Sequence, residues 1–182
     1  MDALGSTAAD LLLWSWRLYA APAILGLGLI AALGRVFQLG PARMWPKAAY
    51  VALEVAVEAV RLLIMAVVIG LGDLAAGFRR TTAFFMAGDL GAALTRLGVG
   101  WMHHWPQALA AIGAFVIVAV ILNVIVFAIA PLVPLRRLAD AAGVPAYDDA
   151  GSKTAVVLFI KNLTIIPFTM VWLWGLLLFL SK

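Results

Sequence analysis

ALAAIGAFVIVAVILNVIVFAIAPLV, residues 108–133, decides the fold class of this chain. The stretch carries no charged side chain, and Asn123 is its one strongly polar residue. A helix that crosses the hydrocarbon core of a bilayer needs about 20 mostly apolar residues, and this stretch is longer than that. Because lipid offers the backbone no hydrogen-bonding partners, a spanning segment of this kind must be helical. Pro131 and Pro134 close it, since proline cannot continue a helix interior.

Three more stretches of the same character lie on either side of this one, at residues 11–33, 48–71 and 155–180. The sequence therefore predicts an all-α, polytopic transmembrane helical bundle of four spans. Residues 1–182 would form it as a single integral membrane domain. Pro22 and Pro167 fall inside spans, where a kink is tolerated if neighbouring groups satisfy the carbonyl that each proline leaves without a donor.

The overall composition agrees with a protein whose solvent is lipid. Hydrophobic residues make up 65% of the chain and charged residues 12%, against roughly 45–50% and about 25% in soluble domains. The chain has no cysteine, which excludes disulfides and thiolate chemistry. The net charge of +4 is spread over loops and forms no basic run. We therefore expect the lipid bilayer as a partner and no nucleic acid.

Residues 73–105 are too long for a plain loop. Asp73 and Asp89 each stand where a helix N-cap is expected. After Asp89, apolar residues recur at helical spacing, at Leu90, Ala93, Leu94 and Leu97. This pattern predicts one or two amphipathic helices that lie in the membrane interface or pack as a lid on the spans. Lipid or partner contacts would come from Arg79, Arg80, Arg96, Trp101 and Trp105.

The orientation follows from Lys and Arg residues in short loops, which favour the cytoplasmic side. The loops after the first and third expected spans hold Arg35, Arg43, Lys47, Arg136, Arg137 and Lys153. The opposite side holds Arg79, Arg80, Arg96 and Lys182. This imbalance predicts that both termini lie outside, with most tryptophans at the outer interface. The bias toward Ala, Gly, Leu and Arg indicates a bacterial inner membrane.

The most informative residues are polar side chains inside the expected spans. They are Arg17, Glu54, Glu58, Arg61, Asn123, Lys161 and Asn162. A charge at the bilayer centre costs roughly 2.5–3.5 kcal/mol on insertion scales, so these groups must pair, face protein or contact water. Glu54, Glu58 and Arg61 share one helix face. From matched depth, we expect a buried polar layer that pairs Glu54 with Lys161, and Glu58 with Arg61 and Asn123.

This layer has two interpretations. An acidic residue at mid-membrane can carry protons along a path, and Glu58, tuned by Arg61, is the candidate. Alternatively, the charges pair and lock helices or subunits together. Because the bases balance the acids, we favour the second interpretation.

Catalytic chemistry is not indicated. His103 and His104 are adjacent, so on a helix they point about 100° apart and do not form a two-ligand metal site. Asp148 and Asp149 precede the fourth span, where helix-capping aspartates are common. A membrane enzyme acting on lipid would have to use these four residues. We expect no enzyme, no metal and no cofactor.

The functional expectation is a non-catalytic accessory or structural subunit of a larger membrane complex. Four short helices enclose little volume, so the chain is expected to act with other membrane protein subunits or as a homo-oligomer. The alternative is a proton- or ion-coupled transporter or channel for a small solute that works as a homo-oligomer, with Glu58 as its proton-carrying residue.

Overall fold

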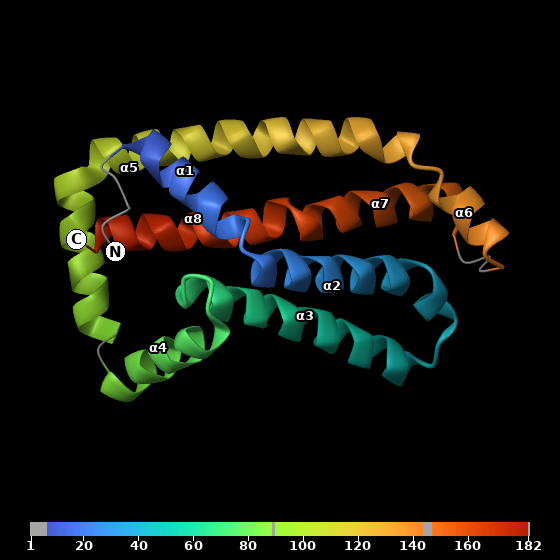
Figure 1. Cartoon of the computed structure of the whole chain (residues 1–182), viewed down its shortest axis with the longest axis horizontal. Coiled ribbons are helices and arrows are strands. Elements are labelled where there is room, and N and C mark those ends of the chain that lie inside the picture. Colours follow the sequence, from blue (N-terminus) through green and yellow to red (C-terminus); the bar gives the residue numbers. More distant parts are fainter. Residues whose placement is uncertain (1–6, 89, 144–146, 182) are drawn as a thin grey trace.

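The computed structural model of the protein describes residues 7–88, 90–143 and 147–181. Within these ranges every regular element is a helix, as the sequence predicts. Figure 1 shows the long helices lying side by side, with α4 and the first part of α5 set across one end of the bundle and α6 at the other. The end that carries α4 is also where α1 begins and α8 ends.

The first expected span is two helices in the structure, α1 (Ala8–Tyr19) and α2 (Pro22–Leu39). The stretch expected as one span at 11–33 is therefore divided between two helices, and the segment long and apolar enough to cross a membrane is Pro22–Leu39. Pro22 occupies the first position of α2 rather than the inside of a helix, because its missing N–H costs nothing in the first turn. Thr7 and Asp10 form a reciprocal capping box that fixes the start of α1.

The second expected span is α3 (Lys47–Ile69), reached through the short 3₁₀ helix η1 (Pro41–Met44). Helix α4 (Leu74–Ala87) follows at an angle of 87° to α3. Asp73 caps α4 as predicted, since its side chain accepts a hydrogen bond of 2.8 Å from the Ala76 backbone N–H. Arg80 reaches back and donates to the Ile69 carbonyl at the C-terminal end of α3, where positive charge is favourable.

The quoted stretch belongs to α5 (Leu90–Ile129), which contains a break at His104. His104 has φ −119° and ψ 17°, two residues before Pro106. The proline cannot donate to the carbonyl four residues before it, and its ring clashes with that carbonyl. As a result, the part of α5 before the break runs across the end of the bundle (Figure 1). Asp89, the expected cap of this helix, lies outside the described residues.

The chain then passes through η2 (Ala130–Leu132) and α6 (Leu135–Ala141) into α7 (Asp149–Leu163) and α8 (Ile165–Leu180). The fourth span is thus broken at Thr164, three residues before Pro167. Pro167 leaves the Leu163 carbonyl without its helical donor. The Tyr19 hydroxyl on α1 donates to that carbonyl at 3.1 Å. A group from another helix thus replaces the missing donor, as expected from the sequence for a proline inside a span.

The helices pack in a defined order. α2 lies against both α3 and α7, while α1 and α5 pack on α8. One core cluster gathers around Leu11, Ala108 and Trp172, and a second around Ile24 and Val67. Trp172, expected at the membrane interface, is 3% exposed and stacks on Phe115 with ring centroids 4.2 Å apart.

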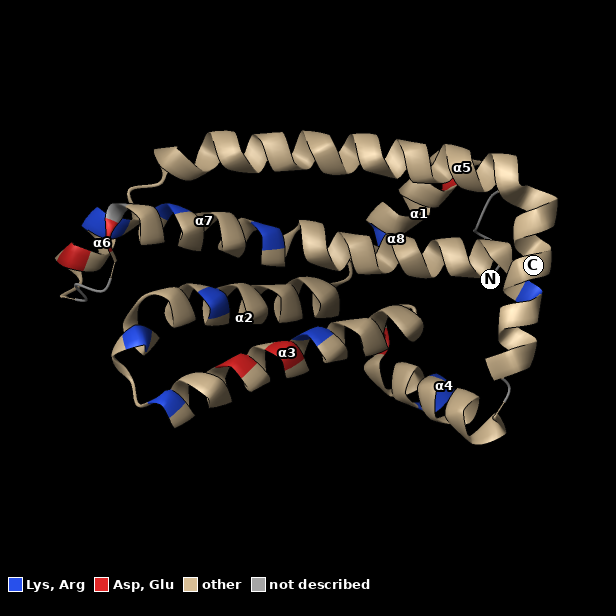
Figure 2. Ribbon diagram, turned by 180° about the vertical axis from the view of Figure 1, so that it is seen from behind, with Lys and Arg blue, Asp and Glu red and all other residues tan. Residues whose placement is uncertain are grey.

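Three helical segments of the described chain are long and apolar enough to cross a membrane: Pro22–Leu39, Leu90–Leu132 and Ala150–Leu180. The bent pair α3 and α4 makes a fourth if it counts as one broken span. Such lengths and compositions are those of an integral membrane protein. Figure 2 shows charged residues on α2, α3, α4 and α7 and toward the ends of the bundle, while the long part of α5 carries none.

Candidate functional site: an ion cluster between three helices

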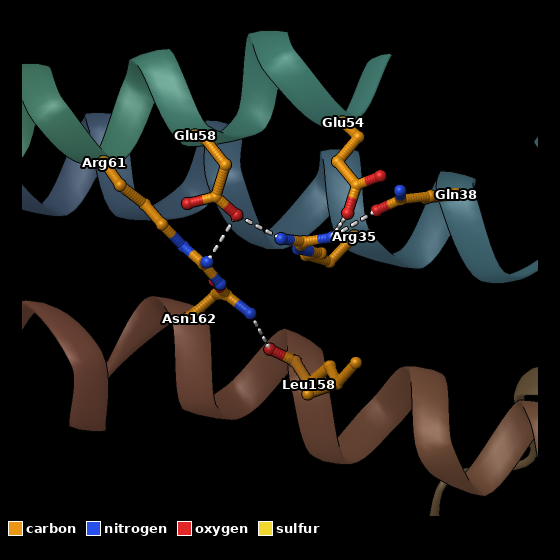
Figure 3. Close-up of polar contacts among 7 residues, drawn as sticks. All are labelled: Arg35, Gln38, Glu54, Glu58, Arg61, Leu158 and Asn162. Atoms are coloured by element: carbon orange, nitrogen blue, oxygen red, sulfur yellow. Dashed lines mark hydrogen bonds and ion pairs between the residues drawn. The ribbon is translucent and has the colours of Figure 1, made fainter. Parts of the chain in front are cut away.

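An ion cluster joins α2, α3 and α7. We define it as Arg35, Gln38, Glu54, Glu58, Arg61 and Asn162 (Figure 3). Glu58 lies at its centre and accepts hydrogen bonds from two guanidinium groups, those of Arg35 and Arg61. The Arg61 Nη1 to Glu58 Oε1 distance is 2.7 Å. The Arg35 guanidinium also pairs with Glu54, with Nη1 3.8 Å from Oε1. Two acids and two bases thus form a continuous chain of charge.

Two buried amides extend the cluster into the bundle. Arg61 Nη2 donates to the Asn162 side-chain oxygen at 2.7 Å, and the Asn162 amide donates to the Leu158 carbonyl at 2.7 Å. Gln38 accepts from Arg35 Nη1 at 2.6 Å. Asn162 is 1% exposed and Gln38 3% exposed. The amides therefore hold both guanidinium groups in fixed positions on the inner side of the cluster.

The close approach of α2 and α3 brings the charges within reach of one another. A Cβ atom at Gly34 would lie 2.5 Å from Cγ2 of Val57, so the helices can come this close because position 34 has no side chain. Small residues permit the same kind of contact between transmembrane helices in general. Gly34 precedes Arg35 and Val57 precedes Glu58, so the tight contact places the ion pair directly beside it.

The cluster has an inner and an outer side. The side chains of Arg35 and Arg61 are 17% and 21% exposed, whereas those of Glu54 and Glu58 are 49% and 48% exposed. The guanidinium groups therefore point toward the bundle and the carboxylates toward its outside. The charges of the four groups cancel, so the cluster needs no further counter-ion. The cluster can therefore hold the three helices together. It also exposes carboxylate oxygens on the outer face of α3.

The sequence placed several of these residues correctly and paired others wrongly. Glu58 and Arg61 form the expected pair, and Asn162 belongs to the same cluster. The expected pairs of Glu54 with Lys161 and of Glu58 with Asn123 are replaced by contacts with Arg35. The reason is helix order: α2 lies between α3 and α7, and α5 packs on α1 and α8. Matched depth does not reveal which helices are neighbours.

The remaining expected members of the layer lie elsewhere. Lys161 Nζ lies 4.9 Å from the ring centroid of Phe127 on α5, a cation–π geometry. Asn123 donates to the Ala119 carbonyl of its own helix at 2.8 Å. Arg17 is exposed in the last turn of α1, where a positive charge complements the helix C-terminus.

Arg35 is a cluster residue that the sequence prediction does not include, because that prediction ends the first span at residue 33 and places Arg35 in the following loop. A usable signal was present. In a helical hairpin that turns at Met44 and Trp45, both helices rise by the same distance per residue. Two residues that are equally far from the turn therefore lie opposite one another. Arg35 is nine residues before Met44 and Glu54 is nine residues after Trp45. This equal spacing predicts that Arg35 lies opposite Glu54.

The polar residues outside the spans lie at opposite ends of the bundle. Arg79, Trp101 and Trp105 are exposed on α4 and around the break in α5, and Arg96 lines a hollow with Phe84 and Trp174. His103 and His104 are also at this break, whereas Asp148 caps α7 with a 2.5 Å bond from the Gly151 N–H. These histidines and Asp148 cannot share one catalytic site.

The connection into α7 is held to α2 by Tyr147. Its hydroxyl donates to the Val36 carbonyl at 2.7 Å. Burial raises the pKa of Tyr147, and the nearby positive charge of Arg43 opposes this shift. The hydroxyl is therefore protonated and available as a donor at neutral pH.

Comparison of the chain with protein-family models, with curated protein sequences and with solved structures finds no match.

Proposed function

We propose that the protein is a non-catalytic subunit of a larger membrane assembly and that the outer face of α3 meets its partner. The observation that carries this proposal is the half-exposed state of Glu54 and Glu58, whose side chains are 49% and 48% exposed on a helix otherwise rich in alanine and valine. In an isolated bundle these carboxylates would border lipid.

The depth of the carboxylates makes lipid an unfavourable neighbour. Glu58 is eleven residues after Lys47 at the start of α3, which is about 16 Å along the helix at 1.5 Å per residue. The hydrocarbon core is about 30 Å thick, so Glu58 would lie near its middle. A partner helix that covers this face and supplies polar groups would remove part of the cost of exposing an ion pair to hydrocarbon.

The exposed surface of α3 also has a stripe of small side chains, offset around the helix from Glu54 and Glu58, of the kind that transmembrane helices use for close contact. Exposed alanines recur along it at Ala48, Ala52, Ala56 and Ala59. Helix pairs in membranes are enriched in small residues because these let the backbones approach. The exposed surface of α3 thus offers a neighbouring membrane protein two stripes, one of small residues and one of outward-facing carboxylates.

The proposal includes a topology of four spans, in which α3 crosses the membrane in addition to the three longer candidates, and the chain bends at the end of α3 into α4. α4 and the part of α5 before His104 would then be interfacial helices at one membrane surface. Because Arg35 belongs to α2, the basic residues counted in the expected loops become five on one side of the membrane against four on the other, where Lys182 is counted from its place in the sequence alone. Both termini outside, in a bacterial inner membrane, remains the orientation that this smaller excess favours.

A proton- or ion-coupled transporter that works as a homo-oligomer is the second candidate. The observation in its favour is that Glu58 is both half exposed and connected to other charges at mid-depth. The charge balance within the ion cluster favours the structural role, since the acids already have partners. If the second candidate is right, flux through reconstituted protein is abolished by Glu58→Gln.

Cysteine cross-linking tests the proposal directly, because the chain has no cysteine of its own. Val55→Cys and Leu62→Cys place a thiol on the outer face of α3, at positions 62% and 72% exposed. Ile117→Cys is the matched control on α5, at a position 62% exposed. In native membranes, we expect a short thiol-to-amine cross-linker to join the α3 variants to one foreign membrane subunit and to leave the control unlinked.

Native mass spectrometry of the gently extracted complex gives the stoichiometry. A foreign subunit at a fixed ratio supports the subunit proposal. Cross-linking between two copies of this chain, with no foreign subunit, supports the homo-oligomer and leads to the flux assay with Glu58→Gln. A monomer that cross-links to nothing through α3 refutes the proposal.

A further inference from the structure

We propose that the protein holds one anionic phospholipid at the α6 end of the bundle, with the phosphate in a basic pocket and an acyl chain along α5. The pocket has a volume of about 580 Å³ and lies where α5 ends, between α6 and the first turn of α7. Arg136, Arg137 and Lys153 line it together with Asp140. These groups carry three positive charges and one negative charge.

The arrangement of charges leaves the pocket positive. Asp140 is engaged with Arg136, at 3.9 Å from Nε to Oδ2. Arg137 and Lys153 come from different elements, α6 and α7, and face the same hollow. Arginine and lysine side chains bind phosphate oxygens through charge-assisted hydrogen bonds. A phosphate ester is therefore the ligand chemistry that this pocket fits.

The position of the pocket identifies the source of the phosphate. Pro131 and Leu132, directly after the apolar part of α5, form its rim. Basic residues immediately outside a span lie at the level of lipid headgroups. A lipid phosphate would reach the pocket from within the membrane surface, whereas a soluble phosphate would have to compete with the headgroups around it.

A second hollow supplies a place for the lipid chain. It is nearly all apolar, has a volume of about 520 Å³ and follows one face of α5 from Phe115 to Phe127. Ala119 and Val120 line its middle, where the short Ala119 side chain leaves room between the two phenylalanines. Phe127 is twelve residues after Phe115, which is about 18 Å along the helix at 1.5 Å per residue. This length is about the depth of one leaflet of a 30 Å core.

The two hollows follow one another along the chain, the apolar one on α5 and the basic one beginning in η2. Phe127 ends the apolar hollow and Pro131, four residues later, lines the basic pocket. One helical turn therefore separates the place for the chain from the place for the phosphate. This alignment with the membrane normal is the geometry of a phospholipid whose headgroup is at the α6 end.

The test titrates the full-length protein in nonionic detergent with phosphatidylglycerol or phosphatidylcholine and counts bound lipids by native mass spectrometry. We expect one phosphatidylglycerol to bind in preference to phosphatidylcholine. The double variant Arg137→Gln/Lys153→Gln should bind it about tenfold more weakly, because two charge-assisted contacts are lost. The control Lys47→Gln/Arg79→Gln makes the same change in net charge away from the pocket and should bind as the parent does.

A second pair of variants tests the apolar hollow. Val120→Trp fills the hollow at a residue that is 56% exposed, and Ile121→Trp is a matched change outside the lining at 52% exposure. We expect Val120→Trp to weaken binding of phosphatidylglycerol and Ile121→Trp to leave it unchanged. Competition by glycerol phosphate, with no effect of Val120→Trp, would make the site one for a soluble phosphate ester. Equal retention of both lipids by parent and double variant would refute the site altogether.

Discussion

Arg35 bonds to both carboxylates of the ion cluster, and its own position is fixed by buried Gln38. Removing its charge while keeping a polar side chain leaves Glu54 and Glu58 with the single base Arg61. Breaking a poorly solvated ion pair by removing one partner costs about 3–5 kcal/mol. We predict that Arg35→Gln lowers the free energy of unfolding by about 3 kcal/mol, measured by SDS titration in mixed micelles.

Two further variants control this prediction. The double variant Arg35→Gln/Glu54→Gln restores charge balance around Glu58 and should recover most of the loss. Arg79→Gln removes an exposed arginine on α4 and should change stability by less than about 0.5 kcal/mol. Equal losses for Arg35→Gln and Arg79→Gln would mean that the ion cluster does not stabilise the bundle.

Tyr19 acts on a different helix through one hydroxyl group. It donates to the carbonyl that Pro167 leaves without a donor. Tyr19→Phe should lower the free energy of unfolding by about 1–2 kcal/mol, because a buried acceptor loses its partner. In the Pro167→Ala background, the new N–H at position 167 can bond to Leu163 and the same change should cost much less. A double-mutant cycle on these two positions measures the coupling.

At the scale of the helix, the sequence predicts the positions of the apolar segments well. It predicts the ends and breaks of the helices less well. Apolar length alone identified 108–133 and 155–180, because lipid leaves the backbone no alternative to a helix. The breaks at Ala20, His104 and Thr164 depend on prolines whose effect differs by position. Pro22 starts a helix, whereas Pro106 and Pro167 each follow a break closely, and composition does not distinguish these cases.

The bend between α3 and α4 depends on close backbone contact. A Cβ at Gly77 would lie 1.8 Å from the Ala66 carbonyl oxygen. We predict that Gly77→Ala lowers the free energy of unfolding by about 2–3 kcal/mol, because backbone atoms must move apart. Gly98→Ala is the matched control: its Cβ would meet nothing within 4 Å, and the better helix former should stabilise α5 by up to about 1 kcal/mol. SDS titration and protease resistance at α4 compare the two.

For the molecule as a whole, the sequence predicts the class of membrane protein but not which helices are neighbours. Depth along the membrane normal follows from residue number, since each residue adds about 1.5 Å. Neighbour relations depend on how side chains from distant segments pack. For this reason Glu58 and Arg61, one turn apart on one helix, were paired correctly, whereas Lys161 and Asn123 were assigned to Glu54 and Glu58 wrongly.

Topology is also a property of the whole molecule. Met44 and Met86 lie before α3 and at the end of α4, and they are 87% and 84% exposed. If α3 crosses the membrane, then Met44→Cys and Met86→Cys react with a membrane-impermeant maleimide from opposite sides in oriented vesicles. Leu132→Cys, 78% exposed next to α6, should react from the same side as Met44→Cys. Labelling of positions 44 and 86 from one side would instead make α3 and α4 a re-entrant pair.

The Tyr19 to Leu163 hydrogen bond joins residues 144 positions apart, and α1 packs on α5 and α8. During synthesis, α1 leaves the ribosome long before these partners exist. Until translation has reached α8, the apolar face of α1 must therefore contact the membrane surface or the insertion machinery instead. The N-terminal helix thus completes its packing late, although it is made early. A mutation in α8 that weakens this packing should consequently leave α1 accessible to quality-control proteases.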